Sequence, residues 1–290
     1  MSSAAAVDTD GPLAIICGGG TLPLTIADSV SRRGRPVVMF ALRGHADATL
    51  VARYPHHWLR VGQFGAFARL AKLAGCRDVV LIGSLVRPGL WALRPDFGAL
   101  LALPHIMRAY RGGDNHLLSG VARIFEGHGF RMLGAHEVAP EILVPEGALG
   151  RFDASADQRG DIAFGLSYLR ASGAFDIGQA VVVARNRILA VEAAEGTDQM
   201  LRRIKELRAT GRLATAAGEG VLVKAAKPGQ DKRFDLPSIG PNTVAGVANA
   251  GMAGIGVVSG TTVIADPERT VHDADSARIF IVGISPDTAQ

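Results

Sequence analysis

Short apolar runs alternate with longer amphipathic segments near the start of the chain, and this alternation constrains the fold more than any other feature. The apolar runs at 13–17, 36–41 and 79–82 predict strands, and the segments 22–33 and 64–74 have the spacing of helices. Strands that alternate with helices form parallel β-α-β units, because a parallel connection needs a crossover long enough to hold a helix. The N-terminal part is therefore predicted to be a Rossmann-like, layered α/β domain.

The C-terminal half is predicted to be a second α/β domain. Residues 180–184 and 188–193 have the pattern of a β-hairpin with its turn at 185–187. The other expected elements are helices at 89–126 (broken at 111–114), 158–171, 197–208 and 242–250, and strands at 130–133, 221–224, 255–258, 263–265 and 279–283.

The two predicted domains, at 11–137 and 158–290, are joined by a stretch that lacks periodicity. Residues 138–157 hold two prolines and many turn formers, so they are predicted to be a linker. A cleft between two domains is the usual place for a ligand, so the ligand cleft is expected there.

Composition places the chain among ordinary globular proteins. Hydrophobic residues make up 48% and charged residues 20% of its 290 residues, which suits a packed core rather than a disordered chain. The net charge of +4 fits an anionic ligand or an anionic membrane surface. Nucleic acid fits less well, because only 6% of the residues are aromatic and no basic stripe interleaves with stacking residues.

The N-terminus and the cysteines favour the cytoplasm. The first residues lack the basic start and apolar run of a secretory signal, and no apolar stretch reaches the ~18 residues needed to cross a bilayer. Cys17 and Cys76 lie in apparent core segments without metal-ligand spacing, so they are predicted to be buried, reduced thiols. We therefore expect a cytoplasmic protein, either soluble or peripheral to a membrane.

The most concentrated cluster of charges lies in residues 224–243, between prolines and glycines that forbid a long helix or a central strand. Its main charged residues are Lys224, Lys227, Asp231, Lys232, Arg233 and Asp235. Cations beside carboxylates suit a diphosphate and its divalent metal, because lysines meet phosphate oxygens while a carboxylate holds the metal. A solvated surface loop with mixed charges is the alternative interpretation.

Three consecutive glycines follow the first predicted strand. Gly18, Gly19 and Gly20, followed by Thr21 before the next helix, would let backbone N–H groups approach a phosphate at a helix N-terminus. Their spacing fits neither the dinucleotide fingerprint GxGxxG nor a Walker loop. A nucleotide or phosphate contact and an ordinary tight turn are about equally good interpretations.

Carboxylates lie beside a predicted helix start at 191–201. Thr197 as the N-cap, with Asp198 facing the helix dipole, gives those two residues a structural explanation. Glu195 has no capping role, so it is the more interesting candidate for a metal or substrate ligand, with Asp198 as the other.

Polar residues at two further places are candidates for the site. Asp114 and Asn115 follow a pair of glycines and are suited to cap a helix or to bind a sugar, and His136 lies at a predicted strand end near the linker. None of the eight histidines has a zinc spacing, and His56 and His57 are predicted to lie in a surface loop. The apolar segment 90–110 is interpreted as a buried helix pair, an acyl-chain tunnel or a surface that rests on anionic lipid.

A set of segments occurs in a specific order along residues 13–284. They are GGGTLP, GSLVRP, RGGDN, GAHEV, DIGQAVVV, VEAAEGTDQML, KAAKPGQDKRFDLPSIGPNTV and AGMAGIGV. Together they resemble the LpxI family, the UDP-2,3-diacylglucosamine pyrophosphatases of lipid A biosynthesis in Gram-negative bacteria.

The resemblance implies a Mg²⁺-dependent hydrolysis of UDP-2,3-diacylglucosamine to UMP and 2,3-diacylglucosamine 1-phosphate (lipid X). It places the aspartate essential for hydrolysis on Asp235, in the RxDLPxIG element. Asp235 is then expected to ligate Mg²⁺, with Glu195 and Asp198 as further ligands. The other expected contacts of the substrate are Lys224, Lys227, Gln230 and Arg233, and also Gly18, Gly19, Gly20, Thr21, Asp114, Asn115, His136 and Thr197.

A lipid substrate also implies a transient contact with the inner-membrane surface, and the sequence leaves a homodimer open. Two other functions compete with the hydrolase. One is a different nucleotide-sugar enzyme, such as an oxidoreductase with a Rossmann-like first domain, and the other is a non-catalytic regulator that binds a nucleotide or a lipid. Convergence of the carboxylates and lysines on one site favours an enzyme, and a scattered arrangement favours binding or structure.

Overall fold

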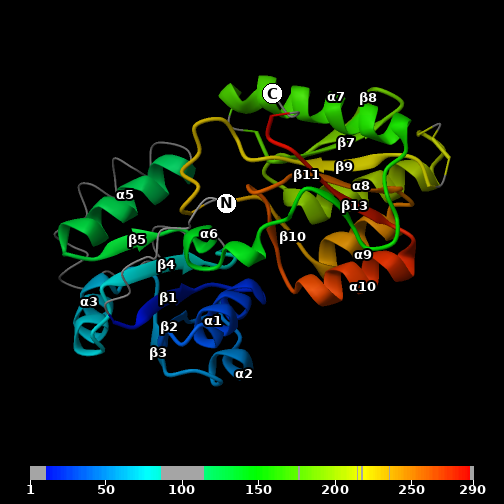
Figure 1. Cartoon of the computed structure of the whole chain (residues 1–290). Coiled ribbons are helices and arrows are strands. Elements are labelled where there is room, and N and C mark those ends of the chain that lie inside the picture. The colour runs from blue at the N-terminus through cyan, green and yellow to red at the C-terminus, as the bar shows by residue number, and fades with distance from the viewer. Residues whose placement is uncertain are drawn as a thin grey trace. The chain divides into compact units, whose positions relative to one another are not determined.

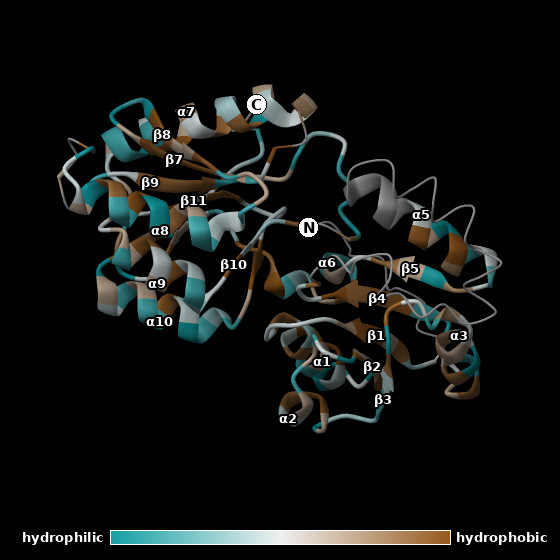
Figure 2. Cartoon of the chain, turned by 180° about the vertical axis from the view of Figure 1, so that it is seen from behind, coloured by the Kyte–Doolittle hydropathy of each residue, from teal (hydrophilic) through white to brown (hydrophobic). Residues whose placement is uncertain are grey.

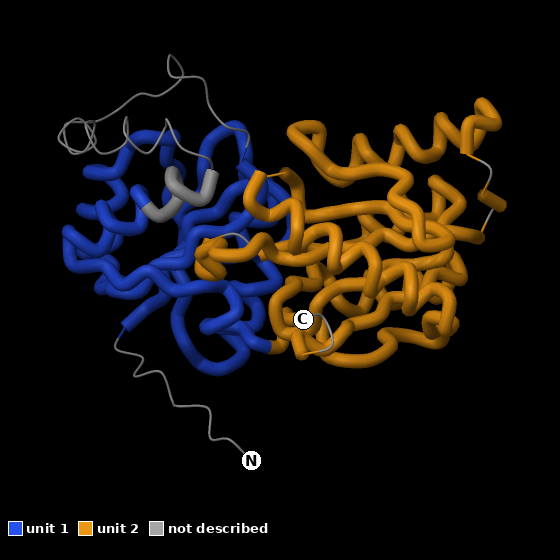
Figure 3. The backbone as a smooth tube through the Cα atoms, turned by 90° about the horizontal axis from the view of Figure 1, so that it is seen from above, with its two compact units in different colours: residues 1–140 blue, residues 141–290 orange. Residues whose placement is uncertain are grey.

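The computed structural model describes residues 11–85, 114–175, 177–213, 215–216, 218–234 and 236–287, without the side chains of 114–119. The chain divides into two compact units, residues 1–140 and 141–290 (Figure 3). Each unit has its own sheet, so the prediction of an α/β protein with two domains is confirmed. The expected cleft between the domains stays a prediction.

The described strands of the N-terminal unit form a parallel sheet with the order β3-β2-β1-β4-β5 (Figure 1). The strands are β1 Leu13–Cys17, β2 Val37–Leu42, β3 His56–Leu59, β4 Asp78–Ile82 and β5 Arg131–Leu133. The helices are α1 Leu22–Arg32, α2 Ala48–Val51, α3 Phe64–Leu73, α5 Asp114–Gly127 and α6 Ala135–Val138. This strand order reverses between β1 and β4, as in the Rossmann-like fold that the sequence predicted.

Helices cover both faces of this sheet. Helix α1 contacts α6, whereas α3 and α5 share an aromatic cluster with the sheet. In that cluster the ring centroid of Phe67 of α3 lies 4.7 Å from that of Phe40 of β2 and 5.1 Å from that of Phe125 of α5. The predicted helix at 89–126 is described only from Asp114, and the apolar segment 90–110 lies outside the described residues.

The prediction that His56 and His57 lie in a surface loop is wrong. Both residues belong to β3, which pairs in parallel with β2 through His56↔Met39 and His57↔Phe40. The His57 ring lies against Phe40, with centroids 5.5 Å apart. The pairing comes from the tertiary structure, because four residues with two histidines carry no clear period-2 pattern.

The described strands of the C-terminal unit form a mixed sheet with the order β6-β13-β11-β9-β7-β8, beside a small β10-β12 pair. The strands are β6 Gly147–Leu149, β7 Ala180–Ala184, β8 Arg187–Val191, β9 Val221–Lys224, β10 Ser238–Ile239, β11 Gly254–Val258, β12 Val263–Ile264 and β13 Phe280–Ile284. The helices are α7 Ala156–Ser172, α8 Gly196–Ala209, α9 Pro241–Asn249 and α10 Pro267–Ala277. Helix α7 covers one face of the sheet, and α8, α9 and α10 cover the other (Figure 1).

Alternation along the strands separates the two faces of this sheet. In β9, Leu222 joins the core under α8 and α9, whereas Val221 and Val223 join the core under α7. The strands of both sheets are largely hydrophobic, and the helices around them mix hydrophobic with hydrophilic residues (Figure 2). A strand buried on both faces reads as a continuous apolar run, which explains why β7 and β9 could be predicted from the sequence.

The hairpin of β7 and β8 turns at Arg185 and Asn186, within the predicted turn 185–187, although Arg187 already belongs to β8. Arg185 and Asn186 both adopt left-handed backbone conformations, with φ of 53° and 55°. The buried Asp161 on α7 accepts the N–H of Arg185 at 3.1 Å and that of Asn186 at 2.6 Å. This carboxylate therefore supplies partners for the two central N–H groups of the turn.

Residues 138–157, predicted to be a linker, contain regular structure. Strand β6 pairs antiparallel with β13 through Leu149↔Ile281, and α7 begins at Ala156. Leu143 forms an isolated bridge with Val263.

Helix α10 was not predicted at all, because its sequence PERTVHDADSA has few apolar residues to mark a helical face. None of the helices in the described ranges is long and apolar enough to cross a membrane.

Candidate active site

The glycine loop of the N-terminal unit lies at the carboxyl end of β1, beside the end of β4. Gly18 donates its N–H to Ile82 at 2.9 Å, and Gly19 donates to the Ser84 carbonyl at 2.8 Å. A Cβ atom on Gly18 would lie 2.6 Å from that carbonyl oxygen. These two glycines are therefore explained by a close approach of two backbones, and their N–H groups already donate to carbonyls at the end of β4 and just beyond it.

Gly20 and Thr21 differ from the first two glycines because both are exposed at the start of α1. Gly20 has a φ of +89°, and no atom lies within 4 Å of the position of its absent Cβ. Thr21 occupies the N-cap position of α1 without a side-chain capping hydrogen bond. An anion is stabilised at such a helix start. A phosphate contact at Gly20 and Thr21 therefore stays a prediction.

His136 lies at the same edge of the sheet as the glycine loop. It follows β5, whereas the glycine loop follows β1, and β4 lies between these two parallel strands, so both segments lie beyond carboxyl ends at one edge of the sheet. Its Nδ1 atom is buried, and the described residues offer it no hydrogen-bond partner. Asp114 and Asn115 begin α5, and their side chains lie outside the described residues.

Lys224 is the centre of the candidate site in the C-terminal unit. It ends β9 and follows Leu222 by two positions, so alternation turns its side chain toward α8. The residue is only 7% exposed. Its ammonium donates to the Thr197 hydroxyl at 3.1 Å and to the Ser238 carbonyl at 2.9 Å. Two residues predicted from distant segments, Lys224 and Thr197, are thus in contact.

The surroundings of Lys224 carry positive charge from the backbone as well. Thr197 lies in the first turn of α8, and Ser238 lies two residues before Gly240, the N-cap residue of α9. Neither helix has a side-chain capping bond at its N-terminus. A buried ammonium beside two uncapped helix starts favours an anionic ligand.

A chain of hydrogen bonds joins Thr197 to the loop that follows β9. Thr197 donates to Glu192 at 3.1 Å, and the other oxygen of Glu192 accepts the Gln179 N–H at 3.1 Å. The Gln179 amide donates to Gln230 at 3.1 Å, and Gln230 accepts the Lys227 N–H at 2.9 Å. The predicted residues Lys224, Thr197, Gln230 and Lys227 therefore belong to one connected network.

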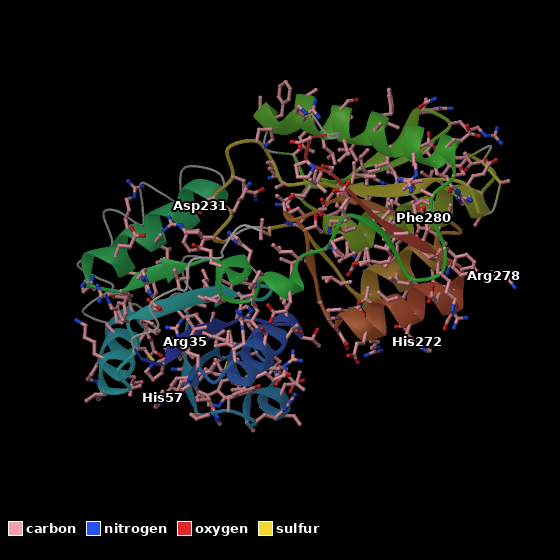
Figure 4. The ribbon with its side chains drawn as sticks, in the orientation of Figure 1. Arg35, His57, Asp231, His272, Arg278 and Phe280 are labelled. Carbon is pink, nitrogen blue, oxygen red and sulfur yellow. The ribbon has the colours of Figure 1, made fainter. Side chains whose placement is uncertain are left out.

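The loop between β9 and β10 is held in shape by its own contacts. The Asp231 carboxylate binds the Arg233 guanidinium at 2.9 Å and also accepts the Arg233 N–H at 3.1 Å. A Cβ on Gly173 would lie 2.5 Å from Pro228, so the loop packs against the segment after α7. Figure 4 shows Asp231 on this loop. The alternative of a freely solvated loop is disfavoured by these contacts.

The three predicted metal ligands have different outcomes. Asp235 lies outside the described residues. Glu195 is paired with Arg203 at 3.3 Å, and Asp198 is exposed in the first turn of α8. The predicted N-cap was wrong, because α8 begins at Gly196, with Glu195 in the N-cap position, and Thr197 bonds to Glu192 instead.

The donor set is compatible with Mg²⁺ but does not by itself define a metal site. Within the part of the chain that the structure describes, no three His, Cys, Asp or Glu side chains are grouped to hold an ion. Mg²⁺ keeps several waters and needs only one or two carboxylates, which Asp235 with Glu195 or Asp198 would supply. The metal therefore stays a prediction.

Cys17 is next to the glycine loop but is not suited to act as a nucleophile. Cys17 and Cys76 are both buried and free, as predicted. Burial raises the pKa of the Cys17 thiol to about 11, so the neutral thiol predominates at pH 7.

Comparison with known proteins fits this architecture. Models of the LpxI N-terminal domain and the LpxI C-terminal domain match residues 12–142 and 145–282. A protein of Caulobacter vibrioides named UDP-2,3-diacylglucosamine pyrophosphatase LpxI is 40% identical over 274 residues, which cover 94% of this chain and 98% of that protein.

The chain belongs to the LpxI family. The two LpxI domain models meet close to the division between the structural units at 140 and 141. A UDP-glucose-4-epimerase structure from Stenotrophomonas maltophila, with bound NAD, is 10% identical and has a TM-score of 0.29, over 92% of this chain and 98% of that one. A likeness at that level carries no argument.

Sequence reasoning passed over two residues that connect this LpxI site. Neither Glu192 nor Gln179 was among the predicted site residues. The predicted hairpin held the necessary information, because pairing Val181 with Val191 brings Gln179 and Glu192 to the open end of the same hairpin. Extending the register past the last strand residues would have found both.

Proposed function

We propose that this protein hydrolyses the diphosphate of UDP-2,3-diacylglucosamine and releases UMP and 2,3-diacylglucosamine 1-phosphate, in the biosynthesis of lipid A. The observation that carries the proposal is the buried Lys224 beside two uncapped helix starts, in a chain of the LpxI family. The 40% identity to a relative named for this activity supports the same substrate.

Charge neutralisation is the main task in hydrolysing a diphosphate, because the phosphoryl transition state needs little covalent assistance. In the proposed reaction, water attacks the phosphorus on the glucosamine side, the bridging P–O bond breaks, and UMP leaves with the electron pair. Lys224 would bind phosphate oxygens together with Lys227 and Arg233, while Gln230 holds the loop. The buried position of Lys224 strengthens its interaction with phosphate, because little water screens it.

Mg²⁺ is the proposed cofactor, held by Asp235 with Glu195 and Asp198 as further ligands. When bound, it would neutralise phosphate charge and position the leaving group. The residues of this chain would orient the diphosphate beside it, since a lysine acts on phosphate as a point charge.

The nucleotide half of the substrate is proposed to contact the N-terminal unit. Gly20, Thr21 and His136 lie at the carboxyl edge of its sheet, where Rossmann-like folds bind their ligands. A dinucleotide-dependent oxidoreductase is the weaker alternative, because the N–H groups of Gly18 and Gly19 donate to backbone carbonyls instead of facing a pyrophosphate. A non-catalytic regulator is the other alternative, and the connected network around Lys224 favours an enzyme.

The test is the release of UMP from UDP-2,3-diacylglucosamine with and without Mg²⁺. We expect release by the wild type only with the metal, and a loss of at least about 10²-fold in kcat for Asp235→Asn, because a neutral amide is a poor Mg²⁺ ligand. Asp273→Asn is the control with the same change of charge, in an exposed pair with Arg269.

Each part of the proposal has its own contrary result. Absence of UMP from the wild type would overturn the function and leave a binding role. Turnover near normal in Asp235→Asn, with wild-type turnover intact, would overturn only the assignment of Asp235. Turnover in the presence of a chelator would overturn the requirement for Mg²⁺.

A further inference from the structure

Glu192 is connected to Lys224 through one intermediate side chain. Its Oε1 accepts the Thr197 hydroxyl at 3.1 Å, and the oxygen of that hydroxyl accepts the Lys224 ammonium at 3.1 Å. A hydroxyl has one proton to donate, so the direction of that donation fixes where its lone pairs point. A carboxylate can only accept hydrogen bonds, so the hydroxyl proton of Thr197 points toward Glu192. The lone pairs of the hydroxyl oxygen are then free to accept the ammonium of Lys224.

The second oxygen of Glu192 is also engaged. Its Oε2 accepts the N–H of Gln179 at 3.1 Å, and the backbone of Glu192 forms hydrogen bonds with Gly178 and Ala180 at the start of the neighbouring strand β7. Gly178 has no room for a side chain, since a Cβ there would lie 2.5 Å from Cγ of Glu192. Glu192 is therefore held in one position by the open end of the β7–β8 hairpin.

Gln179 connects Glu192 to the loop after β9 through hydrogen bonds. Its side chain donates to Gln230, which accepts the Lys227 N–H, and its carbonyl accepts the N–H of Ala225. Glu192 thus reaches both the ammonium of Lys224 and the loop that holds Lys227.

We propose that Glu192 is a positioning residue for diphosphate hydrolysis, acting on Lys224 through the hydroxyl of Thr197. This inference rests on the proposed function. Glu192 does not touch the substrate. It fixes the place of the ammonium that does, and a displacement of a charged group costs more in the transition state than in binding of the ground state.

Four single variants test this hydrogen-bond relay, which runs from Glu192 through Thr197 to Lys224. Glu192→Gln keeps the shape but has only one acceptor oxygen for the two donors, Gln179 and Thr197. Thr197→Val removes the hydroxyl and keeps the shape of the side chain, whereas Thr197→Ser retains the hydroxyl. Glu206→Gln makes the same change of charge on an exposed position of α8 and serves as the control.

We expect Glu192→Gln and Thr197→Val each to lower kcat on the order of 10- to 100-fold with a smaller change in KM. Thr197→Ser should retain kcat within about 3-fold of the wild type. The double variant Glu192→Gln/Thr197→Val should lose little more than either single variant, because the two changes break the same connection. Thermal unfolding of every variant shows whether the fold is retained.

Several results would contradict the relay. A wild-type kcat for either Glu192→Gln or Thr197→Val would overturn it, and so would a double variant in which the two losses multiply. Failure of Thr197→Ser to restore kcat while its unfolding temperature stays normal would also overturn it, since only the hydroxyl should matter. A wild type that releases no UMP would instead overturn the proposed function, so the two failures are distinguishable.

Discussion

At the scale of single residues, Asp78 is a buried carboxylate of the N-terminal unit that two arginines hold. Its side chain is 1% exposed and binds Arg35 at 2.6 Å and Arg131 at 2.7 Å. Burial alone would raise the pKa of this carboxyl, but the hydrogen bonds and charges of the two arginines outweigh burial, so its pKa is lowered. The pair ties together the amino ends of β4 and β5, which begin at Asp78 and Arg131. Figure 4 shows Arg35 in the same unit.

We predict that Asp78→Asn destabilises the N-terminal unit by about 3 kcal/mol at pH 7, because it leaves the largely buried guanidinium of Arg35 without its carboxylate. The pKa of Asp78 is lower in the folded than in the unfolded chain, so its contribution is present above the unfolded pKa and is lost as pH falls through the folded pKa. The difference between wild type and variant should therefore shrink below about pH 4.

Urea unfolding followed by tryptophan fluorescence measures this effect, because both tryptophans, Trp58 and Trp91, belong to residues 1–140. Asp273→Asn, in an exposed pair within the other unit, should leave that transition unchanged. A difference that stayed constant from pH 7 to pH 3 would contradict the assigned charge interaction.

At the scale of elements, the approach of α7 to its sheet depends on glycine. A Cβ on Gly165 would lie 2.8 Å from Val223 and 3.0 Å from Val183, which are side chains of β9 and β7. Gly256 on β11 also permits this close approach, because a Cβ there would lie 2.6 Å from Ile162 of α7. The small residues let the helix and the sheet pack closely, which contributes dispersion contacts and keeps β9 in place.

Gly165→Ala should therefore destabilise the C-terminal unit by about 1–3 kcal/mol, because an added methyl overpacks this contact. Gly160→Ala on the same helix is the matched control, since nothing lies within 4 Å of its absent Cβ. That control should raise stability by about 0.5–1 kcal/mol through helix propensity. Thermal unfolding by calorimetry measures both, and equal effects of the two substitutions would refute the packing explanation.

At the scale of the whole molecule, the chain divides into two compact units, residues 1–140 and 141–290. In the C-terminal unit, both hydrophobic clusters consist of residues from Val144 onward, including Ala154 under α7 and Leu149 of β6. The residues predicted as a linker thus supply part of the core and one strand of the sheet. Figure 3 shows the division of the chain at residue 140.

We predict that a fragment of residues 141–290 folds cooperatively, whereas a fragment of 158–290 is less stable by at least about 2 kcal/mol or does not fold. The shorter fragment lacks β6, the buried Val144 and the first residues of α7, and losing buried apolar side chains costs this much. Urea unfolding by circular dichroism compares the two fragments. Equal stability would show that residues 141–157 do not contribute to the fold of this unit and act only as the linker predicted from the sequence.

Most elements of the fold could be predicted from the sequence, because their information is local. The apolar runs of β1 and β9 matched their strands residue for residue, and the helical spacing of α1 and α3 placed both helices within one residue of their ends. The two-domain α/β class followed from the order of these elements.

The elements that could not be predicted are those that other parts of the chain stabilise. Strand β3 has mixed residues and forms because β2 offers it backbone partners, and β6 forms only against β13. Helix α10 has a weak apolar pattern and packs against α9. Hydrogen bonding across a sheet joins residues far apart in the sequence, so short-range periodicity gives little information about which strands pair.

By itself, the sequence determined the identity of the charged residues, the glycine-rich turn and the family whose ordered motifs this chain carries. Only the tertiary structure decided which of them act together: it joined Lys224 to Thr197 and Glu192, and it gave Gly18 and Gly19 a role in packing two strand ends. The physical reason is that a hydrogen bond needs a partner within about 3 Å, and residues 27 or more positions apart reach that distance only when the sheet and its helices have formed.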